Sequence, residues 1–293
     1  MLPNMANGNI RLAIQKKGRL SEKSLELLKL CGLDIETYSE RLIVSARNFK
    51  IDVLFLRDDD IPEYVQDGVA DIGIVGEDVV YERGANIIVE EKLGFGRCRL
   101  MLAAPSEQLP ATLEEINGKT IATSYPNILK VFLDANNIQA KIIEISGSVE
   151  ITPSLGVADY ICDIVSTGTT LMMNKLKKSF KVFDSEAILI ASNELKNDPE
   201  KLEILNDLTR RIRSVLSAKN SKYLMMNIPR ESLETITEII PSLKSPTVLS
   251  LADENSLAIH AVIPSDKFWC IIDDLKAAGA TGILLLPIEN MIV

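Results

Sequence analysis

The sequence predicts an α/β protein with two lobes, followed by a separate C-terminal βαββαβ domain. Over the first two thirds of the chain, short apolar runs alternate with amphipathic helical segments, which is typical of a mostly parallel sheet covered by helices. After Ser221 the order of strands and helices changes to that of a ferredoxin-like unit. The length of 293 residues also exceeds that of one ordinary core, so more than one domain is expected.

The first lobe begins with a strand over residues 10–14, followed by the glycine-containing loop QKKGRL and a helix that we expect Ser21 to cap and Gly32 to end. The apolar run IDVLFL, residues 51–56, predicts a strand buried on both faces. The acidic segment after it predicts a short helix, capped by an Asp and ended by Gly68, and DIGIVG, residues 71–76, predicts the next strand.

The middle of the chain repeats this order with different residues. Strands are predicted from Cys98, from Lys119 and over KIIEIS and DYICDIV, with a helix near residues 127–136 and another within TLMMNKLKK. A long amphipathic helix follows over residues 199–219. The last segment, 221–293, contains the strand, helix, strand, strand, helix, strand order of a ferredoxin-like domain, a fold that often binds small ligands.

Composition excludes several classes of function. The formal net charge of −9 gives no global attraction to nucleic acid or to anionic lipid, and no apolar stretch is long enough to span a bilayer. His260 is the single histidine, and the four cysteines are far apart, so a zinc site and a histidine-based triad are not expected. Sparse cysteines favour reduced, mostly buried thiols, and we expect a cytoplasmic protein.

The segment CDIVSTGTT, residues 162–170, predicts a phosphate site. It places an apolar strand before a loop of small hydroxyl residues around a glycine, at the start of a helix, where backbone N–H groups and hydroxyls can bind one anion. Asp163 lies three residues before the loop and can accept hydrogen bonds from two neighbouring sugar hydroxyls. An ordinary capped turn is the alternative interpretation, since Ser and Thr are common at helix starts.

The loop QKKGRL provides a second cluster of charge. Lys16, Lys17 and Arg19 are suited to binding a polyphosphate, although a solvated basic loop is an equal alternative. Arg41 and Arg57, each at a strand end, could add positive charge to the same cleft, although lone arginines more often form surface ion pairs. Residues and spacing alone therefore predict a two-lobed protein that binds a sugar phosphate and carries a sensor domain.

The chain resembles the ATP phosphoribosyltransferases of histidine biosynthesis in their long form. The resemblance covers almost the whole chain, and its motifs include LAIQKKGRL, LRDDDIPEYVQDGVADIGIVG, LGFGRCRL, IATSYPN, SGSVEITPSLGVADYICDIVSTGTTL and GILLLPIENM. It implies that ATP condenses with 5-phosphoribosyl 1-diphosphate (PRPP) to give phosphoribosyl-ATP and diphosphate, with Mg²⁺ held mainly by the substrate phosphates. The protein ligands of the Mg²⁺ remain unassigned.

The resemblance also implies a role for individual residues. PRPP would be bound by Glu150, Asp163, Ser166, Thr167, Gly168, Thr169 and Thr170. ATP would be bound by Lys16, Gly18, Arg19 and Tyr125. The charge of the departing diphosphate would be met by Arg19, Lys16, Arg41 and Arg57.

The implied architecture has two periplasmic-binding-protein-like lobes, residues 1–97 with 186–220 and residues 98–185, and a regulatory domain over 221–293. That domain would bind histidine as an inhibitor through Thr247, Asp253, Ala280 and Thr281 where strand ends meet a neighbouring subunit. The family implies a homohexamer in equilibrium with dimers, with AMP or ADP as possible further ligands. Because the chain carries its own regulatory domain, we expect no separate regulatory subunit.

Three alternatives remain open on the sequence. A non-catalytic bilobal binding protein would explain the lobes, but not the pairing of basic and hydroxyl loops. A phosphoribosyltransferase acting on a free base would share the phosphate loop but would lack the ferredoxin-like domain. A pure amino-acid sensor would leave two thirds of the chain without a role.

Overall fold

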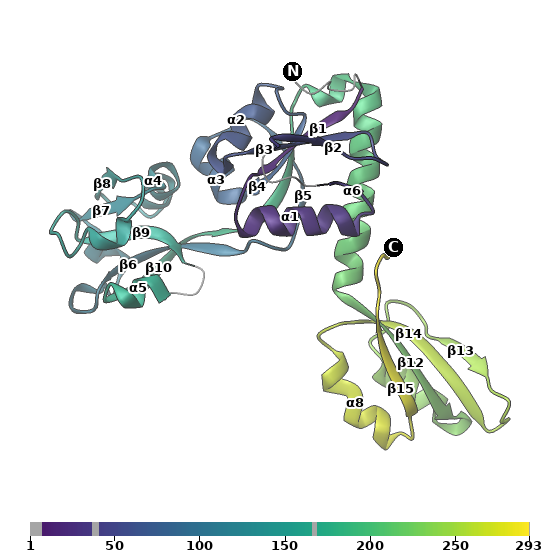
Figure 1. The fold of residues 1–293 in the computed structure, drawn as a ribbon. Coiled ribbons are helices and arrows are strands. Elements are labelled where there is room, and N and C mark those ends of the chain that lie inside the picture. Colours follow the sequence, from purple (N-terminus) through teal and green to yellow (C-terminus); the bar gives the residue numbers. More distant parts are fainter. Residues whose placement is uncertain (1–7, 37–40, 166–168, 293) are drawn as a thin grey trace. The chain divides into compact units, whose positions relative to one another are not determined.

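The computed structural model describes residues 8–36, 41–165 and 169–292. The chain divides into two compact units, one reaching to Lys29 and continuing from Leu33 to Asn206, the other comprising Leu30–Gly32 and the chain from Asp207. The predicted fold class is confirmed, since the described strands form three sheets (Figure 1). Two of these sheets belong to the first unit. Each of them, together with the helices packed on it, is called a lobe below, lobe I and lobe II.

Lobe I contains a six-stranded sheet in the order β2-β3-β1-β4-β11-β5. Its strands are β1 (Ile10–Gln15), β2 (Ile43–Ser45), β3 (Ile51–Leu56), β4 (Ile72–Gly76), β5 (Ile88–Lys92) and β11 (Ala187–Ala191). Its helices are α1 (Arg19–Leu30), α2 (Ile61–Gln66) and α3 (Glu77–Arg83), with a 3₁₀ turn, η1 (Asp58–Asp60), before α2. Apolar side chains of α2 and α3, such as Val65 and Val79, pack on residues of β4 and β11 such as Val75 and Ile190.

Parallel pairing of β1 with β3 fixes the geometry of the binding edge. The two strands pair in register from Ile10 with Ile51 to Gln15 with Leu56, and β4 pairs with β1 in the same direction. The carboxyl ends of these three central strands therefore meet at one edge, where ligands bind in open α/β sheets.

Lobe II contains a five-stranded sheet in the order β10-β6-β9-β7-β8. Its strands are β6 (Cys98–Pro105), β7 (Thr120–Thr123), β8 (Lys141–Glu144), β9 (Tyr160–Val165) and β10 (Leu176–Ser185), and its helices are α4 (Pro126–Ala135) and α5 (Thr169–Met173). Short 3₁₀ turns are η2 (Ser106–Gln108), η3 (Leu113–Ile116) and η4 (Val149–Ile151). Leu129 and Leu133 of α4 pack against Leu102 and Ile121 in the core.

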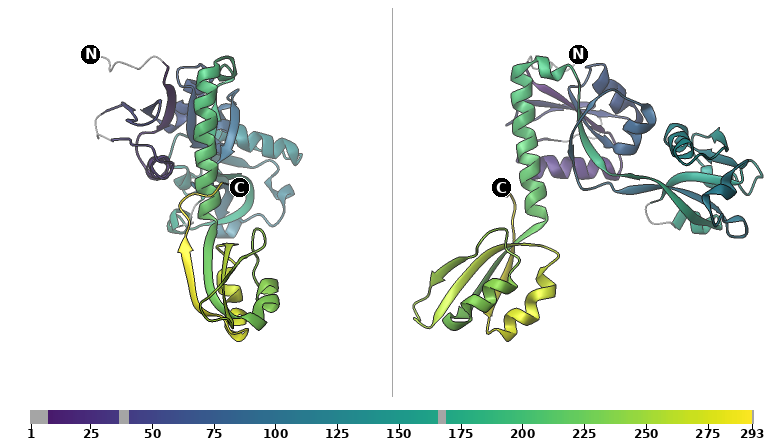
Figure 2. Two further views of the ribbon diagram at one scale, coloured as in Figure 1. Left: turned by 90° about the vertical axis from the view of Figure 1, so that its right-hand side faces the viewer. Right: turned by 180° about the vertical axis from the view of Figure 1, so that it is seen from behind.

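Two neighbouring strand connections join the lobes, as Figure 2 shows. One leads from β5 into β6, and the other leads from β10 into β11. They are tied together by backbone hydrogen bonds, from Leu93 N–H to Ala187 O at 2.9 Å and from Ala187 N–H to Phe95 O at 2.8 Å. Lobe II is thus an insertion whose two ends lie side by side.

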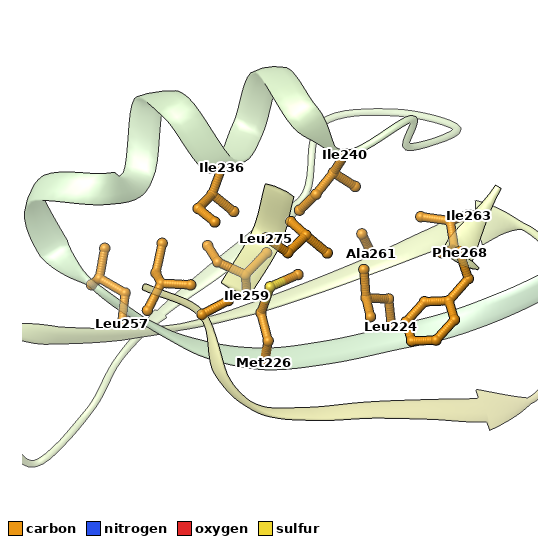
Figure 3. Close-up of a cluster of buried hydrophobic side chains, with 12 residues drawn as sticks. Leu224, Met226, Ile236, Ile240, Leu257, Ile259, Ala261, Ile263, Phe268 and Leu275 are labelled. Carbon is orange, nitrogen blue, oxygen red and sulfur yellow. The ribbon is translucent and has the colours of Figure 1, made fainter. Parts of the chain in front are cut away.

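The last part of the chain holds α6 (Pro199–Lys219), preceded by the turn η5 (Leu195–Asn197), and a four-stranded antiparallel sheet in the order β13-β14-β12-β15. The strands are β12 (Ser221–Pro229), β13 (Thr247–Ser250), β14 (Ser256–Pro264) and β15 (Thr281–Pro287). With the turn η6 (Arg230–Ser232), α7 (Leu233–Ile239) and α8 (Phe268–Ala277), they form the predicted βαββαβ unit. Figure 3 shows its core, in which Ile236 and Leu275 of the helices pack on Met226 and Ile259 of the sheet.

Several local predictions are wrong. Ser21 does not cap α1, because the helix begins at Arg19 and Ser21 lies buried inside its first turn. Asp60 occupies the N-cap position of α2, but its side chain makes no capping hydrogen bond. The helix predicted within TLMMNKLKK is present but short: α5 ends at Met173, and β10 begins at Leu176, where pairing with β6 replaces the helical pattern.

The cysteines agree only partly with the expectation of buried thiols. All four are free; Cys31 and Cys162 are buried, Cys98 is half-buried and Cys270 is exposed on α8. Within the described ranges 8–36, 41–165 and 169–292, no helix combines the length and the apolar character that crossing a membrane requires.

A charge network at the far end of the lobe I sheet stabilises the fold. The buried Asp71 carboxylate accepts hydrogen bonds from Arg11 N at 2.7 Å, Arg11 Nε at 3.2 Å and Lys201 Nζ at 2.9 Å. Burial alone would raise the pKa of Asp71, but the bonds from Arg11 and Lys201 outweigh it and hold the pKa below its usual 3.8. The carboxylate therefore stabilises the fold when ionised.

We expect Asp71→Asn to lower the free energy of unfolding by about 2 kcal/mol at pH 7, because Arg11 and Lys201 lose their counter-charge. Since the folded-state pKa is depressed, this contribution is present above the unfolded pKa and is lost as pH falls through the folded one. Urea denaturation at pH 7 and at acidic pH measures it, with Asp67→Asn, an exposed carboxylate, as control. Equal loss at both pH values would contradict the assignment.

Candidate active site

Positive side chains from three segments meet at the carboxyl edge of the lobe I sheet. Lys16 follows β1 directly, and its N–H donates to Leu56 O at 2.8 Å, which places it beside Arg57 at the end of β3. Arg41 precedes the edge strand β2 and lies at the same edge, because Leu42 O accepts from Phe55 N–H at 2.9 Å. The side chains of Lys16, Arg41 and Arg57 are exposed.

Gly18 and Arg19 complete this edge. Gly18 has φ +105°, a conformation that side chains rarely adopt, and it turns the chain from β1 into α1. Arg19 is the first residue of that helix and is exposed. The turn thus holds the Lys16 and Arg19 side chains within one short loop at the sheet edge, which suits them to bind one polyanion.

Buried carboxylates lie behind the positive edge. Asp58, the first residue after Arg57, has its Oδ1 buried without a hydrogen-bond partner. Burial, together with the charges of Asp78 and Asp59, raises the pKa of Asp58 to about 6. Asp78, at the start of α3, accepts from the Ser185 hydroxyl at 2.6 Å, and Ser185 Oγ accepts from Asp78 N–H at 3.0 Å. These residues were not predicted, although a run of three Asp after a buried strand was a usable signal.

Gly76 is required beside Asp78. A Cβ added at Gly76 would lie 2.3 Å from Asp78 Oδ1, closer than real atoms approach. The glycine therefore allows the Asp78 side chain to fold back onto Ser185, which belongs to the second connection between the lobes.

In lobe II, the predicted ribose ligands are neighbours. Asp163 on β9 is half-buried, and its Oδ1 accepts from the N–H of Ile164 at 2.7 Å. Burial raises the pKa of Asp163, the Ile164 N–H opposes that rise, and the negative charge of Glu150 adds to it. Glu150 lies in η4, which packs beside β9, so the two carboxylates belong to adjacent elements. An ionised Asp163 can accept two hydrogen bonds from a diol.

Part of the predicted phosphate loop lies outside the described residues. Ser166, Thr167 and Gly168 fall there, and so do the side chains of Thr169 and Thr170, whose backbone begins α5. The described strand nevertheless leads into the loop at Val165. Arg99 of β6 is the register partner of Val165, so a cation stands beside the entry to the loop.

Tyr125 lies where the two lobes meet. It occupies the N-cap position of α4 and is half-buried. Burial raises its pKa above the usual value, and the charges of Asp78 from lobe I and Asp163 from lobe II raise it further. Tyr125 therefore stays neutral and can act as a hydrogen-bond donor between the edges of the two lobes.

Two cavities lie along the junction of the lobes. One, of about 580 Å³, is lined by residues of both connections and by the end of β9, among them Arg97, Arg99 and Val165. The other, of about 700 Å³, is lined by Asp59, Glu82, Tyr125 and neighbouring residues. Both volumes lie in the range of small-ligand sites.

The four predicted histidine-site residues do not meet within one chain. Thr247 lies on β13 and Thr281 on β15, which are the two edge strands of the sheet. Asp253 is exposed in the turn after β13, where it accepts from the Ser256 hydroxyl at 2.6 Å and from Asn255 N–H at 3.1 Å. Hydrogen bonds from Ser256 and Asn255 lower its pKa. Ala280 is buried before β15.

The described part of the chain contains no preformed metal site. Within it, no group of three or more His, Cys, Asp or Glu side chains is placed to hold a metal ion. Mg²⁺ that is held chiefly by substrate phosphates and water needs only one or two protein carboxylates, and Asp163 on β9 and Glu150 in the adjacent η4 are the candidates in lobe II.

Comparison with known proteins adds independent information. Residues 57–214 match the family model described as ATP phosphoribosyltransferase, and residues 218–290 match the model of that family's C-terminal domain. An ATP phosphoribosyltransferase of Cytophaga hutchinsonii is 51% identical over 97% of this chain and 98% of its own length. One of Phocaeicola vulgatus is 49% identical over 97% and 100%.

A solved structure agrees with these matches. A chain of the ATP phosphoribosyl transferase (HisG:HisZ) complex from Thermotoga maritima is 31% identical, with a TM-score of 0.58, over 70% of this chain and 98% of its own.

Proposed function

The chain belongs to the ATP phosphoribosyltransferase family. On that basis we propose which residues bind each substrate and which stabilise the leaving group. The enzyme is a pentosyltransferase that condenses ATP with PRPP to give 1-(5-phospho-β-D-ribosyl)-ATP and diphosphate, the first step of histidine biosynthesis. ATP and PRPP are therefore its substrates.

Lobe II binds the ribose phosphate. Asp163, with Glu150 beside it, accepts hydrogen bonds from the ribose hydroxyls, and Ser166, Thr167, Gly168, Thr169 and Thr170 bind the 5-phosphate. The position of Asp163 on β9, beside the turn η4 that carries Glu150, supports this assignment. The hydroxyl loop at the start of α5 is suited to the phosphate because such loops direct several donors at one anion.

Lobe I binds the diphosphate and ATP. The observation that carries this assignment is the in-register pairing of β1 and β3, which places Lys16 and Arg57 at one edge beside Gly18, Arg19 and Arg41. A ring nitrogen of adenine attacks the anomeric carbon as the bond to diphosphate breaks, so these cations stabilise the charge of the leaving group. Tyr125 donates a hydrogen bond within the cleft, between the two substrates.

A divalent metal is expected from the family. We assign it as Mg²⁺ bound to the substrate phosphates, with Glu150 as the candidate protein ligand. When bound, it would neutralise part of the diphosphate charge. Positioning of the substrates remains the task of the side chains named above.

We assign residues 1–97 with 186–220 to the first catalytic lobe, 98–185 to the second, and 221–293 to the regulatory domain. The division into compact units differs from this assignment, because it places residues 207–220 with the C-terminal unit. The enzyme works in the cytoplasm, where ATP and PRPP are produced.

A substrate matrix tests the function. Diphosphate release is expected with ATP and PRPP in the presence of Mg²⁺, and not when a free purine or pyrimidine base replaces ATP. Turnover with a free base would favour a phosphoribosyltransferase of nucleobase salvage. Binding without release would favour a non-catalytic bilobal protein.

Histidine inhibits the enzyme through the C-terminal domain. Thr247 and Asp253 lie toward one edge of its sheet, and Ala280 and Thr281 toward the other. A complete site therefore needs a second copy of the chain, which supports a homo-oligomer, a hexamer in equilibrium with dimers. AMP or ADP would compete at the ATP site. The related complex from Thermotoga maritima contains HisZ; this chain carries its own C-terminal domain and needs no separate regulatory subunit.

We expect removal of residues 222–293 to leave activity and to abolish inhibition by histidine. The site is distinct from both substrate sites, so inhibition is a coupling between them, typically about 1–3 kcal/mol. Histidine titrations of the full-length and truncated enzymes, at saturating ATP and varied PRPP, measure it. Circular dichroism must show that the truncated chain is folded. A folded, active and equally sensitive truncated enzyme would disprove the regulatory role.

A further inference from the structure

Helix α4 of lobe II begins without a cap from its own segment. Its N-cap residue is Tyr125, whose side chain makes no capping hydrogen bond, and its first residue is Pro126, which has no N–H. The next N–H groups, those of Asn127 and Ile128, have no acceptor within the helix. Their partner must come from elsewhere in the chain.

Glu82 of lobe I supplies that partner. Its Oε1 accepts from Asn127 N–H at 3.0 Å and its Oε2 accepts from Ile128 N–H at 3.0 Å. The backbone O of Glu82 also accepts from Asn127 Nδ2 at 2.9 Å. A carboxylate at a helix N-terminus is favoured both by hydrogen bonding and by the helix dipole. Nothing in the sequence near residue 126 reveals this contact.

The contact is part of a wider junction between the lobes. One residue earlier on α3, the ring of Tyr81 lies 5.0 Å from the ring of Phe183 on β10, centroid to centroid. Glu82 and Tyr125 line the same cavity of about 700 Å³. The end of α3 thus touches lobe II through one charged and one aromatic contact, next to Tyr125, which lines the same cavity.

We propose that Glu82 is a positioning residue that holds the two lobes in the closed arrangement required by both substrates. Opening the lobes would leave the N–H groups of Asn127 and Ile128 without their carboxylate. Without Glu82, these hydrogen bonds would no longer favour the closed arrangement over the open one. Tyr125, which immediately precedes α4, would then no longer be held between the lobes. Glu82 touches neither substrate in this role, which rests on the proposed assignment of the two substrates to the two lobes.

The proposal has a distinctive consequence for binding. If only the closed state binds substrate well, a lower closed fraction weakens every cleft ligand by the same factor. A residue that contacted ATP or PRPP directly would instead weaken one of them. We therefore expect Glu82→Ala to raise the Kd of ATP and the Kd of PRPP equally, by about tenfold. Saturating substrate should restore kcat to near the wild-type value.

Calorimetry on the full-length enzyme, with ATP and PRPP titrated separately, measures both affinities. Glu82→Gln keeps the side-chain shape and one carbonyl acceptor but loses the charge, so a smaller, equal increase in both Kd values is expected. Glu26→Gln is the matched control, because Glu26 is an exposed carboxylate on α1 of lobe I that lines neither cavity and does not cap α4. The control should change each Kd less than twofold.

Hydrogen exchange provides a second readout. The amides of Asn127 and Ile128 should exchange faster in Glu82→Ala than in the wild type, and PRPP together with ATP should slow them again. The proposal is overturned if one affinity falls alone, if neither falls, or if kcat falls while both Kd values stay constant. If Glu82→Ala does not fold, the same criteria apply to Glu82→Gln. If the wild-type enzyme does not turn over ATP and PRPP at all, the proposed function itself is wrong.

Discussion

Arg19→Ala is expected to lower kcat by roughly 100- to 1000-fold, with a much smaller rise in the KM for PRPP. Arg19 is the first residue of α1 and lies close to Lys16 in the preceding loop. Both residues lie at the edge of the sheet where Arg57 follows β3. The diphosphate gains charge as its bond to the anomeric carbon breaks. A guanidinium that meets this growing charge stabilises the transition state more than the bound substrate.

Steady-state kinetics with both substrates varied measure the effect. Lys29→Ala provides the control, because Lys29 is an exposed cation in the last turn of the same helix and should leave kcat unchanged. A change confined to KM would make Arg19 a simple binding residue. Partial rescue by added guanidinium would support its role as a cation in the transition state.

For Asp163→Asn, we expect a rise in the Kd of PRPP of roughly 10- to 150-fold, equivalent to about 1.5–3 kcal/mol, and a smaller change for ATP. The substitution removes an ionised acceptor that we assign to the ribose hydroxyls. Titration calorimetry measures both affinities, and Asp134→Asn, an exposed carboxylate on α4 of the same lobe, is the control. Equal losses for the two substrates would contradict the assignment.

The pH dependence provides a further check on Asp163. Burial raises the pKa of Asp163 above 3.8, and the Glu150 charge adds a smaller rise. The hydrogen bond from the Ile164 N–H acts in the opposite direction. On the proposed assignment the ionised form binds the ribose hydroxyls, so PRPP affinity should fall as pH is lowered through that raised pKa. The Asn variant should lack this component.

The strands that position the site could be predicted because their signals are local. The run IDVLFL is apolar at every position except Asp52, and it forms β3, buried at five of its six residues. The loop after β1 could be located in the same way, since Gly18 interrupts two regular segments. Their adjacency in space then follows from the parallel pairing expected of such segments.

Other features depend on partners far away in the chain and could not be predicted from local pattern. The strand β10 reads as a charged, irregular segment, and it is stabilised by pairing with β6. Glu82 is indistinguishable from any surface glutamate until α4 lies opposite it. Asp58 gives a signal only as one of three acidic residues, and the packing of η1 beside α2 and α3 depends on the tertiary fold.

The insertion of lobe II between β5 and β11 also determines the order in which the enzyme can fold during synthesis. In the described sheet, β5 pairs only with β11, and β11 alone joins it to β4. Strand β5 is therefore synthesised long before its partner β11, because residues 93–186 are translated between the two strands. At about 5–20 residues per second, β5 and one side of β4 remain unpaired for several seconds. During that interval the lobe I sheet has an open edge, which makes the nascent chain a candidate for chaperone binding and for aggregation when expressed rapidly.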